Sequence, residues 1–434
     1  MTARAKDKNR VMEKGDEIEA IVRRGLLLKG HRRHDEAEQK FKEALRLEPD
    51  NDFVLFHLAS CVGAVEGRRA EAVAIIDRAI SVNPEDADHH ALKAMLLAEE
   101  ASAGESLRCA ESAVRFAPES TFAFLAKAHA HVAGSQWAEA EASARRALQL
   151  DPDNSSAGNL LAHALRMQGQ SAENAAQLRG MLARDAEDPW THTNAGWAAL
   201  QAGRRREAEE HFREALRLDA GMDSAREGLL DSFRARSPLY RGYLAYCFWM
   251  QRFNKKMRWT IIIALYLGAR SAKFLRDTAL APLGIAIGVL YFLMVVWGHV
   301  ARGVGNFMLL FDPFARLALR RGEVLEAWAV GGGISLGAIL LAVGLPLHQA
   351  PLSVVAAGLI VGSIPLAHTF TNASRIGSRI FGCIGAYAVL GAIGWGICLG
   401  AGIDLGGIWP LVMSGGIILA LFSTWFANFD AFRR

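Results

Sequence analysis

The sequence lacks the residue patterns that usually carry catalysis. Its 434 residues contain no HExxH or GxxxxGK[ST] motif, and no GxGxxG follows a predicted strand. The five cysteines lie far apart, with no CxxC pair and no histidine at zinc spacing, which excludes a disulfide scaffold and a conventional zinc finger. We therefore expect no enzyme activity, no catalytic residue, no metal site and no cofactor.

Positive charge is scarce in the part of the chain where charged residues are most frequent. Residues 1–240 carry 33 Lys and Arg against 39 Asp and Glu, a net charge of −6, whereas residues 241–434 carry 16 against 6, a net charge of +10. The acidic part has no basic stripe, so nucleic acid is not an expected partner. Two such different compositions predict two regions with separate cores.

The acidic part contains an internal repeat. Segments that end a helix recur six times, each marked by a proline or its substitute: Pro49, Pro84, Pro118, Pro152, Ala186 and Ala220. The steps between these markers are 35, 34, 34, 34 and 34 residues. Ahead of the markers, small residues recur four and three apart, as in Ala37, Phe41 and Ala44, which places them on one helix face. A glycine such as Gly25 then lies where the preceding helix must approach closely.

This spacing of small residues, phenylalanine and proline resembles the tetratricopeptide repeat (TPR) over roughly residues 18–220. The resemblance implies an all-α solenoid of about six repeats. The fifth repeat departs from the pattern, with Asn174, Leu178 and Met181 at the small-residue positions. Residues 1–17 form a charged N-terminal segment, and residues 221–237 are expected to hold the helix that caps such a stack, over Asp223–Arg234.

The resemblance also implies a binding surface, because ligands of this family usually lie along the concave face made by the first helix of each repeat. The residues of this chain that map onto inward positions are Phe122, His129, Asn159, His163, Trp190, Asn194 and Trp197. Aromatic anchors beside amide donors suit an extended protein segment or peptide. The alternative, that the tryptophans pack against neighbouring helices, stays open.

Charges become rare in the second part of the chain. The uncharged stretches are 278–301, 327–374, 380–403 and 405–429. A membrane-spanning helix needs about 20 apolar residues, so these stretches predict a transmembrane helical bundle after the solenoid. The predicted segments are a juxtamembrane interfacial segment (238–258), a membrane hairpin or re-entrant pair (259–301), a cytoplasmic interfacial helix (302–326), four transmembrane helices (327–429) and a cytoplasmic tail (430–434).

Basic residues predict the orientation of this bundle and its contact with lipid headgroups. The candidate membrane-interface residues are Arg252, Lys255, Lys256 and Arg258. Later basic clusters fall in alternate connections, and the positive-inside rule then places the repeats and both termini in the cytoplasm. The composition favours the bacterial inner membrane, with the lipid bilayer as one partner.

Glycines recur four apart in the predicted spans, and the pairs are Gly284/Gly288, Gly333/Gly337, Gly358/Gly362 and Gly396/Gly400. Such pairs let helices touch backbone to backbone. They predict either tight packing inside one bundle or an interface between copies in a homo-oligomer.

Together these features predict a membrane-anchored scaffold or adaptor that recruits a protein or peptide to the cytoplasmic face through the repeat groove. The rival hypothesis is a channel, transport or translocation component with the repeats as gate or assembly platform, because an anchor needs only one span.

Overall fold

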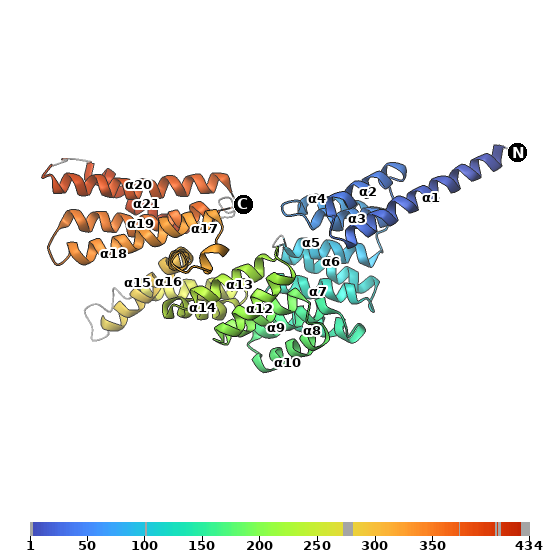
Figure 1. The fold of residues 1–434 in the computed structure, drawn as a ribbon, viewed down its shortest axis with the longest axis horizontal. Helices are drawn as coiled ribbons and strands as arrows, with labels where there is room; N and C mark the ends of the chain where they lie inside the picture. The colour runs from blue at the N-terminus through green and yellow to red at the C-terminus, as the bar shows by residue number, and fades with distance from the viewer. Residues whose placement is uncertain are drawn as a thin grey trace. The chain divides into compact units, whose positions relative to one another are not determined.

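The computed structural model describes residues 3–99, 102–271, 281–372, 374–403, 406 and 409–426. Every regular element within these ranges is helical, which confirms the all-α fold class (Figure 1). The chain divides into two compact units, Met1–Ala198 with Met250–Met257, and Ala199–Trp249 with Arg258–Arg434. The division falls inside the last repeat, upstream of the change in composition near residue 237.

The first unit is a succession of helices that pack in pairs along the chain. Its helices are α1 (Ala3–Gly30), α2 (His34–Leu47), α3 (Asp52–Gly63), α4 (Arg69–Val82), α5 (Ala87–Glu99), α6 (Ala103–Phe116), α7 (Thr121–Ala133), α8 (Trp137–Leu150), α9 (Ser155–Gln168), α10 (Ser171–Arg184) and α11 (Pro189–Gln201), whose last turn belongs to the second unit. Odd-numbered helices are the first helices of the repeats, and even-numbered helices are the second ones.

Small side chains on the second helices let each pair close. In α2, the side chains of Ala37, Phe41 and Ala44 are at most 1% exposed. The Phe41 ring lies 2.7 Å from the place that a Cβ would take on Gly25 of α1, so a larger residue there would require the ring to shift. The predicted buried row of α2 and its glycine partner are confirmed.

The fifth repeat forms in spite of its larger residues. In α10, Asn174, Leu178 and Met181 are buried on the face that carries alanines in other repeats. The Met181 side chain lies 2.9 Å from the place of a Cβ on Gly158 of α9. The missing side chain on the first helix therefore makes room for the larger one on the second.

The second unit begins with the end of the repeats and continues into apolar helices. Its helices are α12 (Arg205–Leu218), α13 (Asp223–Arg234), α14 (Pro238–Gln251), α15 (Lys255–Ser271), α16 (Ala281–Leu309), η2 (Ala315–Ala318), α17 (Arg321–Glu326), the π-helical η3 (Ala327–Gly332), α18 (Gly333–Gly344), α19 (Ala350–Thr371), α20 (Arg375–Gly400) and α21 (Trp409–Phe426). The helix α13 coincides with the expected capping helix, and its Gly228 receives the ring of Phe212.

The structure corrects the sequence prediction over residues 302–326, for which one interfacial helix is expected. Instead, α16 continues to Leu309, a turn follows, and α17 starts a new helix. Pro313 has no N–H and cannot continue α16. The Asp312 Oδ1 atom accepts hydrogen bonds of 2.9 Å from the backbone N–H groups of Phe314 and Ala315, which hold the turn.

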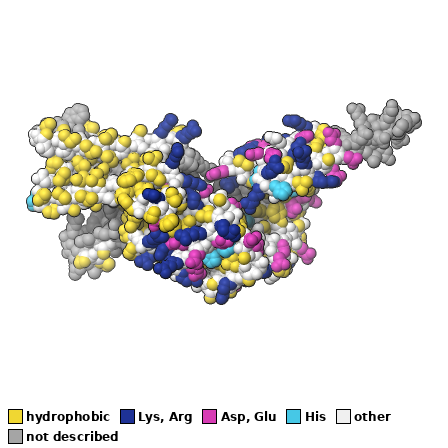
Figure 2. All heavy atoms as spheres, viewed as in Figure 1, with side chains coloured by type: hydrophobic (Ala, Val, Ile, Leu, Met, Phe, Trp, Pro, Cys, Tyr) yellow, Lys and Arg dark blue, Asp and Glu magenta, His cyan; other side chains and the backbone are white. Residues whose placement is uncertain are grey.

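Three helical runs among the described residues are long and apolar enough to cross a membrane. These runs are Arg321–Gly344, Ala350–Phe370 and Arg375–Gly400. Figure 2 shows hydrophobic side chains over the C-terminal helices, while charged side chains of both signs cover the repeats. These helices are compatible with the predicted transmembrane bundle and suggest that the protein associates with a membrane.

Some predicted segments fall on parts of the chain that the structure does not describe. The tail 430–434, the loop around Asp404 and the connection 272–280 lie outside the described residues. On either side of that connection, α15 and α16 are in contact, since the ring centroids of Tyr266 and Tyr291 are 5.9 Å apart. Whether residues 259–301 cross a bilayer stays a prediction.

The glycines of the last helices pack against neighbouring helices of the same chain. A Cβ on Gly358 of α19 would lie 2.0 Å from the Cβ of Ala392 in α20. A Cβ on Gly337 of α18 would lie 2.7 Å from Ile360 Cγ1 and 3.0 Å from the carbonyl oxygen of Ala356, both in α19. Glycine therefore serves backbone-to-backbone packing within one bundle here. The homo-oligomer is untested by a single chain and stays a prediction.

Candidate protein-binding groove and buried polar network

The seven predicted groove residues lie on three successive first helices of repeats. Phe122 and His129 belong to α7, Asn159 and His163 to α9, and the remaining three to α11: Trp190, Asn194 and Trp197. Trp190 is 56% exposed, whereas the other six are half-buried. Their placement on one row of helices agrees with the mapping from the sequence. Their binding role stays a prediction.

Phe122 contributes to the core rather than to an open surface. Its ring packs against three clusters of buried apolar residues, and its centroid lies 6.5 Å from that of Phe56 in α3. Phe122 therefore takes part in helix packing, which leaves the alternative for the tryptophans open.

The amides of Asn159 and Asn194 are brought together by adjacent first helices. The Asn194 Nδ2 atom donates to Asn159 Oδ1 at 2.8 Å, and Asn159 Nδ2 donates to Asp188 Oδ2 at 2.9 Å. The Thr191 hydroxyl donates to the same Asp188 oxygen at 2.5 Å. Sequence reasoning missed Asp188 and Thr191, although Asp188 lies in the turn that starts α11, a recurring polar position of the repeat.

A cavity of about 360 Å³ opens beside this cluster. Its lining includes Asp153, Asp185 and Asp188 from the turns, with Met181 and Gly158 at its apolar side. Arg184 lines it too, and its Nη1 lies 3.2 Å from Asp153 Oδ1. Carboxylates outnumber the cation, so the cavity favours a basic or hydrogen-donating group.

The two histidines of the row are neutral near pH 7. Burial lowers the pKa of His163 to about 3, and the positive charge of Arg166 and the nearby His129 add to this effect. Burial also lowers the pKa of His129. The His163 ring lies 5.7 Å from the Trp137 ring, centroid to centroid. Both histidines therefore carry no charge near pH 7.

A segment from beyond the repeats returns to the first unit and covers the turn between α9 and α10. The carbonyl oxygen of Arg252 accepts a hydrogen bond of 3.0 Å from Trp137 Nε1, and the Arg252 guanidinium lies 3.2 Å from the place of a Cβ on Gly169. Among the predicted membrane-interface residues, Arg252 and Lys256 are exposed and Arg258 is half-buried, whereas the Lys255 side chain lies outside the described set. Their contact with lipid stays a prediction.

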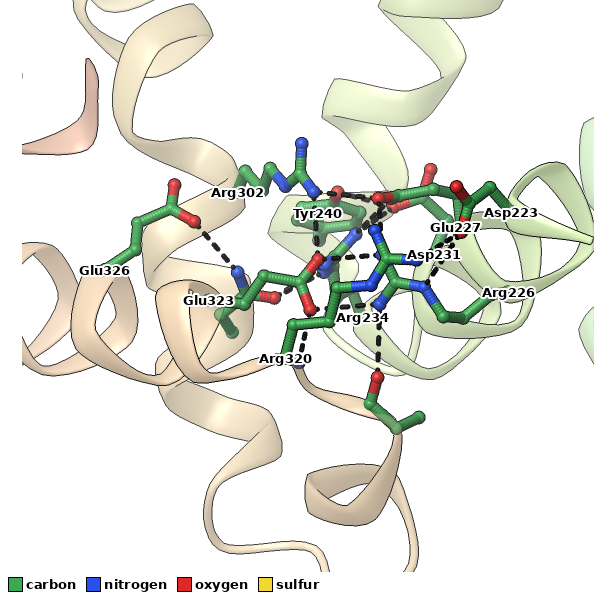
Figure 3. A network of polar contacts seen from close by, with 12 residues as sticks. Asp223, Arg226, Glu227, Asp231, Arg234, Tyr240, Arg302, Arg320, Glu323 and Glu326 are labelled. Atoms are coloured by element: carbon green, nitrogen blue, oxygen red, sulfur yellow. Dashed lines mark hydrogen bonds and ion pairs between the residues drawn. The ribbon is translucent and has the colours of Figure 1, made fainter. Parts of the chain in front are cut away.

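A network of charged and polar side chains connects the end of the repeats to the C-terminal helices within the second unit (Figure 3). Arg226 of α13 makes a bidentate pair with Glu323 of α17, with distances of 3.0 Å from Nη1 to Oε2 and 3.1 Å from Nη2 to Oε1. Arg302 of α16 joins it to α13, because its Nη2 lies 3.0 Å from Glu323 Oε1 and 2.8 Å from Glu227 Oε1.

The second half of the network is deeply buried. Arg234 of α13 is 2% exposed, and its Nη2 donates to Asn306 Oδ1 at 2.6 Å. Asn306 Nδ2 in turn donates to Glu326 at 3.2 Å, and Asp231 accepts from Arg234 and from the Tyr240 hydroxyl. Sequence reasoning missed this set, because residues far apart in the chain supply it. A single signal was available: Glu323 and Glu326 are acidic residues directly before an apolar run.

Comparisons with known proteins agree with the repeat geometry. Models of the tetratricopeptide repeat match residues 28–96, 125–189 and 191–221. No curated protein matches the chain in sequence. Among similar solved structures, that of TTC0263, a tetratricopeptide repeat protein of Thermus thermophilus, is 18% identical, covers 42% of this chain and 98% of its own, and has a TM-score of 0.39.

Two further similar structures are those of pilF and PilW. Pseudomonas aeruginosa pilF is 16% identical, with 52% of this chain and 100% of its own covered and a TM-score of 0.40. PilW, described as a type IV pilus biogenesis factor, is 18% identical, with 49% and 98% covered and a TM-score of 0.41. Residues 28–96, 125–189 and 191–221 are therefore tetratricopeptide repeats, modules that generally act as non-enzymatic scaffolds for protein–protein interaction.

Proposed function

We propose that this protein is a membrane-anchored adaptor. It recruits a protein or peptide to the cytoplasmic face through the first helices of its repeats, α7, α9 and α11. The observation that carries the proposal is the exposure of Trp190, whose indole is 56% exposed at the start of α11. Exposed tryptophans are common energetic anchors of protein interfaces. The backbone N–H of Trp190 donates to Asp188 Oδ1 at 3.1 Å, and Asp188 is one of the residues that line the acidic cavity.

The chemistry of this region favours an extended peptide with an apolar and a basic side chain. The indole of Trp190 offers an apolar face, and the carboxylates of Asp153 and Asp185 in the cavity lining offer acceptors. The amides of Asn159 and Asn194 already bond to each other. They therefore position α11 against α9, and a ligand gains more from the indole and the cavity than from the amides.

The membrane part of the proposal rests on the apolar helical runs and on an exposed apolar turn. Phe311, Phe314 and Leu317 are 72%, 77% and 79% exposed, and Arg316 and Arg320 lie within the same stretch. Apolar side chains beside arginines suit the headgroup region of an anionic bilayer. The lysine and arginine clusters favour a cytoplasmic location for the repeats and both termini.

Confinement to a surface gives recruitment its effect without new contacts, because it raises the effective concentration of a bound partner. The network between α13 and α16–α17 supports this function, since a rigid connection keeps the end of the repeats near the apolar helices. The rival hypothesis, a channel or translocation component, is favoured by one observation: three apolar helical runs exceed what an anchor needs.

Co-purification of the full-length protein from mild detergent, with mass spectrometry, tests the proposal. The full chain is required because Met250–Met257 belongs with the repeats and α13 with the C-terminal helices, so a fragment ending near residue 237 would lose both. The baits are wild type, Trp190→Ala, and Leu27→Ala as a control that removes an apolar side chain 62% exposed in the first repeat.

A partner retained by wild type and Leu27→Ala but lost from Trp190→Ala supports the adaptor function. A partner held equally by all three baits removes Trp190 from the binding site. Solute flux through liposomes that contain the purified protein would instead favour the channel hypothesis.

A further inference from the structure

Three potential metal ligands meet at the start of the third repeat, in the first unit. Asp52 lies in the first turn of α3, Asp86 lies directly before α5, and His89 lies in the first turn of α5. One ligand atom from each residue falls within 4.8 Å of the other two. Two carboxylates and one imidazole therefore gather from two successive first helices.

His89 is buried, and one of its two ring nitrogens has no hydrogen-bond partner. The residue is 3% exposed, and its Nδ1 atom is buried with no hydrogen-bond partner. Its Nε2 atom lies 4.0 Å from Asp86 Oδ1, which is longer than a hydrogen bond. A buried imidazole that lies this close to carboxylates, but beyond hydrogen-bond distance of Asp86, leaves room for an ion between the donor atoms.

Another repeat shows how the same position is satisfied without a ligand. Asp188 and Thr191 follow Asp86 and His89 by three repeat lengths, and the Thr191 hydroxyl donates directly to Asp188 at 2.5 Å. The next residue in both places is a histidine whose Nε2 bonds to a turn carbonyl: His90 to Pro84 at 2.8 Å, and His192 to Ala186 at 3.0 Å. Thr191 thus bonds directly to the aspartate of its turn, whereas His89, at the same position of its own repeat, lies 4.0 Å from Asp86.

We propose that Asp52, Asp86 and His89 bind a divalent transition-metal ion of the zinc class. Imidazole nitrogen with carboxylate oxygens is a donor set that suits Zn²⁺, whereas Ca²⁺ and Mg²⁺ prefer oxygen ligands alone. The ion also offsets the repulsion between the two carboxylates. Since metal–ligand bonds are about 2.0–2.2 Å long, the donors move slightly closer around the ion.

The existing hydrogen bonds leave donor atoms available for this role. Asp86 Oδ1 accepts from the backbone N–H groups of Asp88 and His89, which leaves its Oδ2 for the metal. Asp52 Oδ2 accepts from Asn83 Nδ2 at 3.2 Å, a bond that the ion would replace or share. The bound ion would link α3 to α5, the first helices of the second and third repeats, and so fix the distance between them.

Zinc binding to the full-length protein tests the site. The protein is purified in mild detergent through a tag without histidines, treated with EDTA, and titrated with ZnCl₂ by calorimetry. The variants are His89→Ala and, as matched control, His90→Ala, which removes a neighbouring histidine outside the cluster. Wild type and His90→Ala are expected to bind one more Zn²⁺ than His89→Ala, and Zn²⁺ is expected to raise the Tm only in these two.

Asp52→Asn provides a second measurement, because Asp52 is only half-buried and circular dichroism is expected to show a folded variant even if His89→Ala fails to fold. Its zinc affinity is expected to fall more than tenfold. Equal stoichiometry and affinity in wild type and Asp52→Asn would overturn the proposal, as would the absence of zinc binding by the wild type.

Discussion

The repeats and the apolar C-terminal helices of this chain include two kinds of glycine contact. In the repeats, a large side chain fills the space that glycine leaves on its partner helix, as Phe41 does against Gly25 and Phe212 against Gly228. Between α19 and α20, Gly358 faces Ala392 so closely that the two helix backbones are in contact. Water favours the burial of large apolar side chains, whereas in lipid close backbone contact has to supply the attraction. The second pattern thus fits the membrane location that we propose.

The two units also use charge differently. Charged residues of the repeats form mostly exposed pairs between neighbouring turns, such as Arg23 with Glu19. In the second unit, charges collect in the buried network around Arg234. Exposed pairs add little stability, whereas removing one partner of a buried pair leaves an uncompensated charge. Four predictions sharpen this comparison.

The largest effect is expected for Arg234→Leu. This change leaves Asp231 and Asn306 without their guanidinium partner in the protein interior, and we expect a loss of about 3–5 kcal/mol in the free energy of unfolding. Arg23→Leu, the exposed control, is expected to cost under about 1 kcal/mol. Chemical unfolding of both variants in one detergent, followed by tryptophan fluorescence, measures the difference. Equal losses would contradict the contrast between buried and exposed charges.

The next largest loss of stability is expected when a glycine at a helix contact is replaced by alanine. Gly358→Ala places a Cβ against Ala392, which cannot move unless the helices separate, and about 1–3 kcal/mol of destabilisation is expected. Gly25→Ala meets the Phe41 ring, which can turn, so its cost should be the smaller of the two. Thermal unfolding ranks the two variants, and the reverse order would refute the proposed difference in packing.

Acid should weaken one ion pair of the repeats. Hydrogen bonds from Arg68, aided by Lys42 and opposed by burial, lower the pKa of Glu38 to about 2 from an unperturbed 4.5. The pair therefore stabilises the folded state above about pH 4.5, and this contribution is lost as the pH falls towards 2. Glu38→Gln should cost about 1–2 kcal/mol at pH 7 and nothing near pH 2. Urea unfolding at a series of pH values measures it, and a pH-independent difference would count against the pair.

The smallest effect, with opposite sign, is expected for Gly180→Ala. Gly180 lies inside α10, and a Cβ there would meet no atom within 4 Å. Alanine should stabilise the helix by about 0.5–1 kcal/mol because it loses less backbone freedom on folding. A higher urea midpoint would show that glycine in the repeats matters only where a neighbour approaches. A lower midpoint would mean that Gly180 has an unrecognised contact.

Local pattern predicted much of the fold. The repeat markers and the row of Ala37, Phe41 and Ala44 located the helix pairs, because burial on a helix repeats every three or four residues. The capping helix over Asp223–Arg234 was predicted with its observed bounds. The helix over 302–326 was not, since a turn held by Asp312 outweighs the helical pattern around it.

The candidate site was likewise predicted only in part from the sequence. The position of Trp190 on a first helix follows from the repeat register, but its exposure depends on which neighbours cover it. The amide pair of Asn159 and Asn194 could be placed on one face, but their partner Asp188 came only from the structure.

The sequence by itself determined the helical repeat and the acidic and apolar halves of the chain, because each depends on residues close together in the chain. Tertiary structure alone decided the Arg234 network, the meeting of Asp52 with His89, and the return of Arg252 to the repeats. These contacts join residues many turns apart, and their geometry depends on how whole helices pack.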